Sequence, residues 1–313
     1  MVWLYISIIM VMRVAQSFFS KKNATTLHKN GVSYVKYTAY YQAVAGFFAL
    51  VLFLIELLSG ASVSGVGETF VYAIISGIAL AISSTLGIYI LCQGTMVLSS
   101  LFATAGLIVP TVASIFLYKE YIVWYQWIAL IVFMMGAFFL AGGSKKVYGK
   151  FTISQLLVLT LNLILSGTTM LMQKMFGMNV EGGNVSLFSL LSFLSSALIF
   201  ILILPIMQAL KNKATTQPQE DKFSLYPATP EQGKITKPSF IYGLILALAV
   251  FLVNQLSTIS TPLIEAVVLF AIICGGATII SALVGAIVYK EKITWRTVVG
   301  LIFGIGSLIL LKI

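Results

Sequence analysis

The heptapeptide "YKEYIVW" at Tyr118–Trp124 occurs again, nearly unchanged, as "YKEKITW" at Tyr289–Trp295. The copies are 171 residues apart in a chain of 313, and each follows a long apolar run. Sliding the sequence by this distance also places Ser83–Ser84 on Asn254–Gln255. Repetition at a fixed distance is the sequence signature of a repeated structural unit. We therefore predict that the chain consists of two related halves.

Composition predicts the environment of these halves. Hydrophobic residues make up 59% of the chain and charged residues only 9%, whereas soluble domains average about 25% charged residues. The apolar residues form runs near the ~20 residues that a helix needs to cross a bilayer. We predict an all-α integral membrane protein, with the lipid bilayer as its surroundings. The net charge of +10 comes from lysines in short loops, so it does not indicate nucleic-acid binding.

The apolar runs predict ten transmembrane helices. Their expected bounds are 2–20, 34–58, 69–91, 95–117, 121–141, 152–173, 185–209, 239–259, 265–288 and 294–312. Residues 1–142 form the first five-helix repeat, 143–151 a linker, and 152–313 the second repeat. Residues 211–238 are polar and proline-rich and are expected to form a flexible loop within the second repeat.

An odd number of helices in each repeat has a consequence for topology. The second repeat must enter the membrane from the side opposite to the first, which makes the two repeats inverted. Inverted repeats are common in secondary transporters, whose substrate sites lie near the midplane between the halves. The two copies of the heptapeptide would then form equivalent turns on opposite sides of the membrane.

At this level the chain resembles the EamA-like branch of the drug/metabolite transporter superfamily. The likeness covers essentially the whole chain. It depends on the 5+5 arrangement, on Glu120 and Glu291 after spans four and nine, and on the Gly-rich last span "VVGLIFGIGSLIL". It implies a ten-helix bundle that moves small metabolites or drugs by alternating access. Pro110 matches a proline that this family often carries in span four, as a hinge. Ser281 stands at the equivalent position of span nine, where Gly275 and Gly276 are the expected hinge instead.

Polar residues within the spans predict the substrate site, because such residues usually face a bundle interior or an aqueous cavity. In span six they recur at helical spacing on one face, and span one presents a matching stripe. Helix–helix hydrogen bonding is the alternative role for these residues. The predicted substrate-binding residues are Arg13, Gln16, Tyr37, Tyr41, Ser83, Ser84, Asn162, Ser166, Thr169, Gln173, Asn254 and Gln255.

Arg13 is the most informative of these residues. An arginine at a helix centre costs roughly 2.5–3.5 kcal/mol on insertion scales, and no span has a mid-membrane carboxylate to pair with it. One interpretation is that Arg13 meets an anionic substrate. The other is that its side chain snorkels to the interface near Lys21, where the first span is expected to end.

The remaining motifs narrow the function. No G-x-x-x-x-G-K-[ST] motif occurs, so transport would be secondary, and neither a metal nor another cofactor is expected. The first span lacks the glutamate of proton-coupled multidrug relatives, which favours a neutral or anionic metabolite. We predict a small-molecule transporter of the plasma membrane that is not an enzyme, with export as the expected direction. A membrane-embedded enzyme and a scaffold or sensor subunit are the alternatives. A homodimer through the Gly-rich helices is a further expectation.

Two arguments about orientation disagree. Most of the lysines lie in loops on the side opposite to the termini, and the positive-inside rule places those loops in the cytoplasm and both termini outside. The resemblance implies the reverse. We follow the lysines.

Overall fold

The computed structural model describes residues 2–30, 34–93, 105–119, 123–143, 153–214, 237–290 and 294–312, and these residues are helical apart from short turns. The predicted all-α class is therefore confirmed for the described residues. The helices are α1 (Val2–Asn30), α2 (Tyr34–Leu58), α3 (Val66–Gln93), α5 (Ile108–Tyr118), α6 (Trp124–Gly143), α8 (Ile153–Asn179), α9 (Val185–Ala214), α10 (Lys237–Ser260), α11 (Ala266–Phe270), α12 (Gly276–Ile287) and α13 (Trp295–Lys312), with the π-helical segment η1 (Ala271–Gly275) between α11 and α12.

The outside of the bundle is apolar, as expected for a membrane protein. Large side chains such as Phe116, Ile287 and Trp295 are more than three-quarters exposed. Apolar area of this kind would be unfavourable in water. Six helical stretches in the described residues are long and apolar enough to cross a bilayer: Val2–Ala24, Tyr34–Leu58, Val66–Leu91, Val185–Pro205, Lys237–Ser260 and Val268–Ile287.

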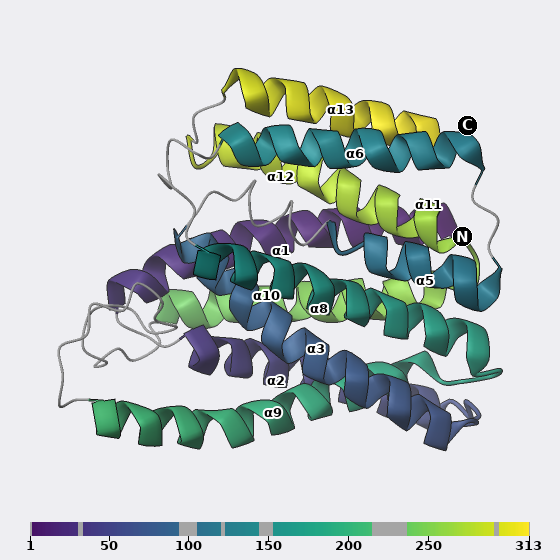
Figure 1. The fold of residues 1–313 in the computed structure, drawn as a ribbon. Helices are drawn as coiled ribbons and strands as arrows, with labels where there is room; N and C mark the ends of the chain where they lie inside the picture. Colours follow the sequence, from purple (N-terminus) through teal and green to yellow (C-terminus); the bar gives the residue numbers. More distant parts are fainter. Residues whose placement is uncertain are drawn as a thin grey trace.

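The helices lie side by side, and both ends of the chain lie at the same end of the bundle (Figure 1). Five close pairs organise the packing: α1 with α10, α3 with α8, α3 with α9, α2 with α9, and α6 with α13. Each pair joins a helix before residue 144 to one after residue 152. The two halves of the chain therefore interdigitate rather than forming separate bodies.

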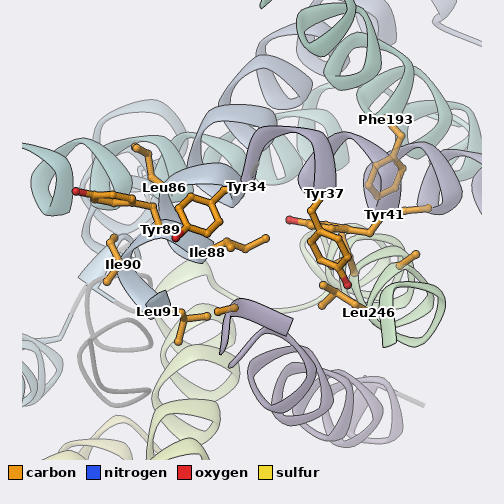
Figure 2. Close-up of a cluster of buried hydrophobic side chains, with 14 of the residues drawn as sticks. Tyr34, Tyr37, Tyr41, Leu86, Ile88, Tyr89, Ile90, Leu91, Phe193 and Leu246 are labelled. Carbon is orange, nitrogen blue, oxygen red and sulfur yellow. The ribbon is translucent and has the colours of Figure 1, made fainter. Parts of the chain in front are cut away.

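The largest apolar cluster lies where α2, α3, α9 and α10 meet. Figure 2 shows Tyr37 and Tyr41 of α2 close to Phe193 and Leu246, and the two tyrosine rings are 5.8 Å apart between centroids. These four side chains are at most 3% exposed. Burying aromatic rings of this size stabilises the contact of α2 with α9 and α10.

Several helix contacts leave no room for a Cβ atom, and two of them show the effect of glycine on the packing. A Cβ atom on Gly77 of α3 would collide with the carbonyl oxygen of Ser192 in α9 and would lie 2.7 Å from the Ser195 Cβ. A Cβ on Gly136 of α6 would lie 2.9 Å from the carbonyl oxygen of Gly300 in α13. The Gly-rich face of α13 therefore packs on α6 within the chain. The predicted homodimer remains a prediction.

The helix of the first span continues beyond the span's expected end. We expected the span to end near residue 20 because Lys21 and Lys22 follow; the stretch apolar enough to cross a bilayer is Val2–Ala24, and α1 itself continues to Asn30. Lys21 donates from Nζ to the Leu91 carbonyl oxygen at 3.3 Å, and the Lys22 Nζ lies 4.4 Å from the centre of the Tyr242 ring. Both charges thus have partners along the bundle, so the helix need not end where they occur.

Other predicted bounds differ in smaller ways. The helix expected at 185–209 continues to Ala214, so the predicted loop 211–238 is helical at its start, and α10 begins at Lys237. The sixth predicted span continues to Asn179, six residues beyond its expected end. The ninth is not one regular α-helix, because η1 interrupts it. Most of the predicted linker and of the 211–238 loop lies outside the described residues.

The repeated heptapeptide begins with the same backbone conformation in both copies. Lys119, which follows the last residue of α5, has φ 53°, and Lys290 has φ 52°. Residues other than glycine seldom adopt this left-handed conformation. Lys119 is the C-cap of α5, whereas Lys290 lies three residues after Ile287, the last residue of α12. Glu120 and Glu291, which also carry the resemblance, lie outside the described residues.

Candidate functional site

A polar cavity of about 170 Å³ lies inside the bundle, with walls from α1, α2, α3, α8, α10, η1 and α12. Ten of the twelve predicted substrate-binding residues line it. They are Arg13, Gln16, Tyr41, Ser83, Ser84, Asn162, Ser166, Thr169, Gln173 and Asn254. None of the described lining residues is acidic.

The polar stripe of α8 forms one wall of this cavity. Asn162, Thr169 and Gln173 are each less than 9% exposed. The hydroxyl groups of Ser166 and Thr169 donate to carbonyl oxygens of their own helix. Gln173 donates from Nε2 to the Oδ1 of Asn254 in α10 at 2.8 Å. This bond connects the α8 wall to the α10 wall.

The facing stripe of α1 carries polar atoms that the protein does not satisfy. The Arg13 Nε and the Gln16 Oε1 are buried, and among the described residues neither has a hydrogen-bond partner. Arg13 is near the middle of α1, because this helix continues to Asn30. The apolar stretch of this helix is Val2–Ala24, so snorkelling towards Lys21 stays the alternative to a role in substrate binding. A cationic donor and a neutral acceptor lie close together in sequence on one cavity wall.

The third wall comes from α2 and α3. Ser84 Oγ accepts a hydrogen bond from the Gln42 Nε2 at 2.9 Å, and Gln42 Oε1 accepts one from Ser196 in α9 at 2.8 Å. Gln42 is fully buried behind the cavity. It therefore fixes the position of Ser84, while Ser83 bonds only weakly to its own helix, to the Leu80 carbonyl at 3.3 Å.

Tyr37 and Gln255 are not among the lining residues. The Tyr37 hydroxyl donates to the Ser239 carbonyl oxygen at 3.4 Å. Gln255 donates to Ser186 at 2.8 Å and accepts from Ser189 at 2.7 Å. Both side chains join α2 or α9 to α10, which is the helix–helix role that sequence analysis kept as the alternative.

Sequence analysis did not include the apolar residues of the cavity wall in the site, and it also omitted four others that carry a hydroxyl or thiol: Ser17, Ser20, Cys274 and Thr278. Ser17 and Ser20 extend the α1 stripe and could have been found from its spacing. Cys274 and Thr278 come from η1 and α12, whose departure from α-helical geometry changes which side chains face inward. No periodic signal in the sequence shows this.

The predicted hinge residues lie at two breaks in regular helix. Pro110 is the third residue of α5, where it removes no bond that the helix needs. Gly275 ends the π-helical segment and Gly276 begins α12. Short π-helical segments often occur at functional sites. Bending at these positions remains a prediction.

The described residues hold no group of three or more His, Cys, Asp or Glu side chains that could bind a metal ion. The cavity therefore offers hydrogen bonds, one positive charge and apolar contacts. Such a lining can bind and orient a small molecule.

Comparison with known proteins shows the fold alone. No family model and no curated protein matches the chain. Among solved structures 28 chains match. One of them, described only as the crystal structure of a protein, is 12% identical, with a TM-score of 0.65 over 97% of this chain and 96% of its own. Nearly the whole chain therefore adopts a fold that occurs in a solved structure.

Proposed function

We propose that this protein is a secondary transporter, similar to the EamA-like transporters, that moves a small neutral or anionic metabolite across the plasma membrane by alternating access. The observation that carries the proposal is the polar cavity inside an apolar bundle, with the Arg13 Nε on its wall, which has no hydrogen-bond partner in the part of the chain that the structure describes. Export is the direction that we expect.

The packing of the helices supports the proposed 5+5 inverted repeat. If each helix is replaced by its counterpart in the other half, the pair α1–α10 becomes the pair α8–α3, and the helices of both pairs are in contact. The same exchange maps α2–α9 and α6–α13 onto themselves. A two-fold relation between the halves requires this pattern. The left-handed Lys119 and Lys290 at matching positions agree with it.

The charge on the cavity wall favours an anionic substrate. Desolvating a guanidinium without an opposite charge is unfavourable, and none of the described lining residues is acidic. A carboxylate or another oxyanion in the cavity would accept from the Arg13 Nε. The Gln16 Oε1 would accept from a donor group on the same molecule.

Flux into proteoliposomes tests the proposal. The substrates are labelled small carboxylates, each paired with its neutral amide. Arg13→Met removes the charge and Arg13→Lys keeps it. A charged hydrogen bond contributes about 1.5–3 kcal/mol, so we expect Arg13→Met to lose about 10- to 100-fold in carboxylate uptake, and Arg13→Lys to lose less.

Arg296→Met is the matched control, because Arg296 is exposed on α13. This variant should transport like the wild type. Equal carboxylate uptake by Arg13→Met and wild type would show that Arg13 has a structural role only. No flux of any compound through correctly folded wild-type protein would contradict the transporter proposal itself and favour an enzyme or a scaffold.

A further inference from the structure

Two lysines make matching contacts in the two halves of the chain. The alignment of the α1 and α8 polar stripes also pairs Lys21 with Lys174. Lys21 donates from Nζ to the carbonyl oxygen of Leu91, in the last turn of α3, at 3.3 Å. Lys174 donates from Nζ to the carbonyl oxygen of Thr261, directly after α10, at 3.0 Å. Since α3 and α10 are themselves the third helices of the two halves, each lysine binds the same part of its own half.

The physical basis of these contacts is the carboxyl end of a helix. Its last carbonyl groups have no partner within the helix, and a lysine there satisfies them and meets the negative end of the helix dipole. Lys174 is only 2% exposed and also donates to the Ile264 carbonyl oxygen at 3.3 Å. A buried ammonium group requires such partners, so this contact holds α8 against the end of α10.

The Lys174 contact closes one end of the cavity. Gln173, the preceding residue, lines the cavity and bonds to Asn254 of α10 at 2.8 Å. The Thr261 hydroxyl donates to the Gln173 carbonyl oxygen at 3.2 Å. Between the cavity and this end of the bundle, α8 and α10 are thus joined by consecutive hydrogen bonds.

The Lys21 contact is at the other end of the cavity. The helices α1 and α8 run in opposite directions along the bundle (Figure 1), and both lysines are in the later part of their helices. Here Ser20 and Leu91 themselves line the cavity, and Lys21 is only partly buried. The cavity therefore extends to the Lys21 contact but stops short of the Lys174 contact.

We propose that the Lys174 contact is the gate that closes the cavity on the side of the two termini, and that the structure shows this gate closed. The Lys21 contact at the other end is formed in the same structure. When the gate opens, Lys174 releases the Thr261 and Ile264 carbonyls and α10 separates from α8. This inference depends on the alternating access of the proposed function, and it adds which contact holds the closed state.

Cysteine labelling tests the closed gate without any transport substrate. The parent has Cys92 and Cys274 replaced by alanine, and the reporter is Thr258→Cys, a buried position one turn from both Asn254 and Thr261. Lys174→Met should make this reporter react about tenfold faster with an impermeant maleimide from the side of the two termini, because breaking a charged hydrogen bond shifts the equilibrium by at least that factor.

The adjacent lysine gives a matched control. Lys22→Met removes a charge that lies over the Tyr242 ring without touching the gate contact, so the reporter should react as in the parent. Lys174→Arg, which keeps the charge and the donors, should also stay close to the parent. An unchanged labelling rate in folded Lys174→Met would overturn the gate role of Lys174.

A cross-link provides a second measurement if Lys174→Met does not fold. A Cβ on Gly177 would lie 3.5 Å from the Thr261 Cβ, within the range that a disulfide spans. It would also collide with the Thr261 Oγ1, which Thr261→Cys removes, and would lie 3.1 Å from the Pro262 Cδ, so the single variant Gly177→Cys is the control for overpacking. In the same parent, without the reporter, Gly177→Cys with Thr261→Cys should cross-link on oxidation and stop flux, and reduction should restore it. Cross-linked protein that still transports would also overturn the proposal.

The two hypotheses fail in different ways. If wild-type protein transports nothing but Lys174→Met exposes the reporter, the gate contact holds and the proposed transport is wrong. If wild-type protein transports and neither experiment responds, transport holds and the gate assignment is wrong.

Discussion

Glu56 joins α2 to the start of α9. Its carboxylate accepts from the Asn184 Nδ2 at 2.9 Å and from the Ser186 hydroxyl at 2.7 Å. Ser186 is fully buried and accepts in turn from Gln255 of α10 at 2.8 Å. The chain thus uses one of its nine acidic residues to connect three helices near one end of the bundle.

We expect Glu56→Ala to lower the free energy of unfolding by about 1–3 kcal/mol, because it leaves the buried Ser186 hydroxyl and the Asn184 amide without their acceptor. Thermal unfolding of the purified protein in detergent measures this. Glu68→Ala is the control, since Glu68 is exposed in the first turn of α3 and contributes only a helix-dipole interaction of about 0.3–1 kcal/mol. Equal melting temperatures for the two variants would contradict the role of Glu56.

The crossing of α3 and α9 leaves no space for a larger side chain at Gly77. The two backbones approach at Gly77, where a Cβ would meet the Ser192 carbonyl. Backbone atoms cannot move aside as the end of a flexible side chain can. The α9 residues that bond to Gln42 and Gln255 lie on either side of this crossing, so its geometry also positions the back of the cavity.

Gly77→Ala should therefore destabilise the protein by about 1–3 kcal/mol or prevent folding, as overpacking does. Gly67→Ala in the same helix is the matched control, because a Cβ there meets nothing within 4 Å. Alanine also favours the helix over glycine by up to ~1 kcal/mol, so this control should be neutral or slightly stabilising. Yield and melting temperature in detergent separate the two variants.

The accuracy of each predicted helix boundary depended on whether the residues that follow the helix form a recognisable turn. The bounds 34–58 of α2 agree with prediction, because an apolar run meets a Ser59–Gly60 turn. The helix α1 extends beyond its apolar stretch Val2–Ala24 to Asn30, and the partner of Lys21 there, the Leu91 carbonyl oxygen, is 70 residues away in the sequence. The π-helical η1 has no periodic signal in the sequence at all.

The candidate site was predicted to a similar extent. Helical spacing gave the face of α8 correctly, since four residues share it. It could not decide between the neighbours Asn254 and Gln255, of which only Asn254 lines the cavity. That choice depends on how α10 is rotated against α9, where Ser186 and Ser189 bind Gln255.

Both ends of the chain lie at the same end of the bundle (Figure 1). Which end of the bundle faces the cytoplasm is therefore predicted from the distribution of charged residues. We predict that the lysine-rich end faces the cytoplasm. With Cys92 and Cys274 replaced, Thr216→Cys should resist an impermeant maleimide in intact cells and react after permeabilisation. The control is a single cysteine at Ser59, which is exposed and directly follows α2, at the end of the bundle away from the lysine-rich loops. It should react both in intact and in permeabilised cells. Labelling of Thr216→Cys in intact cells would show that the termini are cytoplasmic.

The pairing of early helices with late ones has a consequence for biosynthesis. As α1, α2, α3 and α6 leave the ribosome, their partners α10, α9, α8 and α13 have not yet been synthesised. Until then the polar face around Arg13 lacks the cavity walls that α8 and α10 provide. The last helix to emerge, α13, completes the contact with Gly136. Truncated or stalled chains would therefore expose the faces that quality-control proteases and chaperones of the membrane recognise.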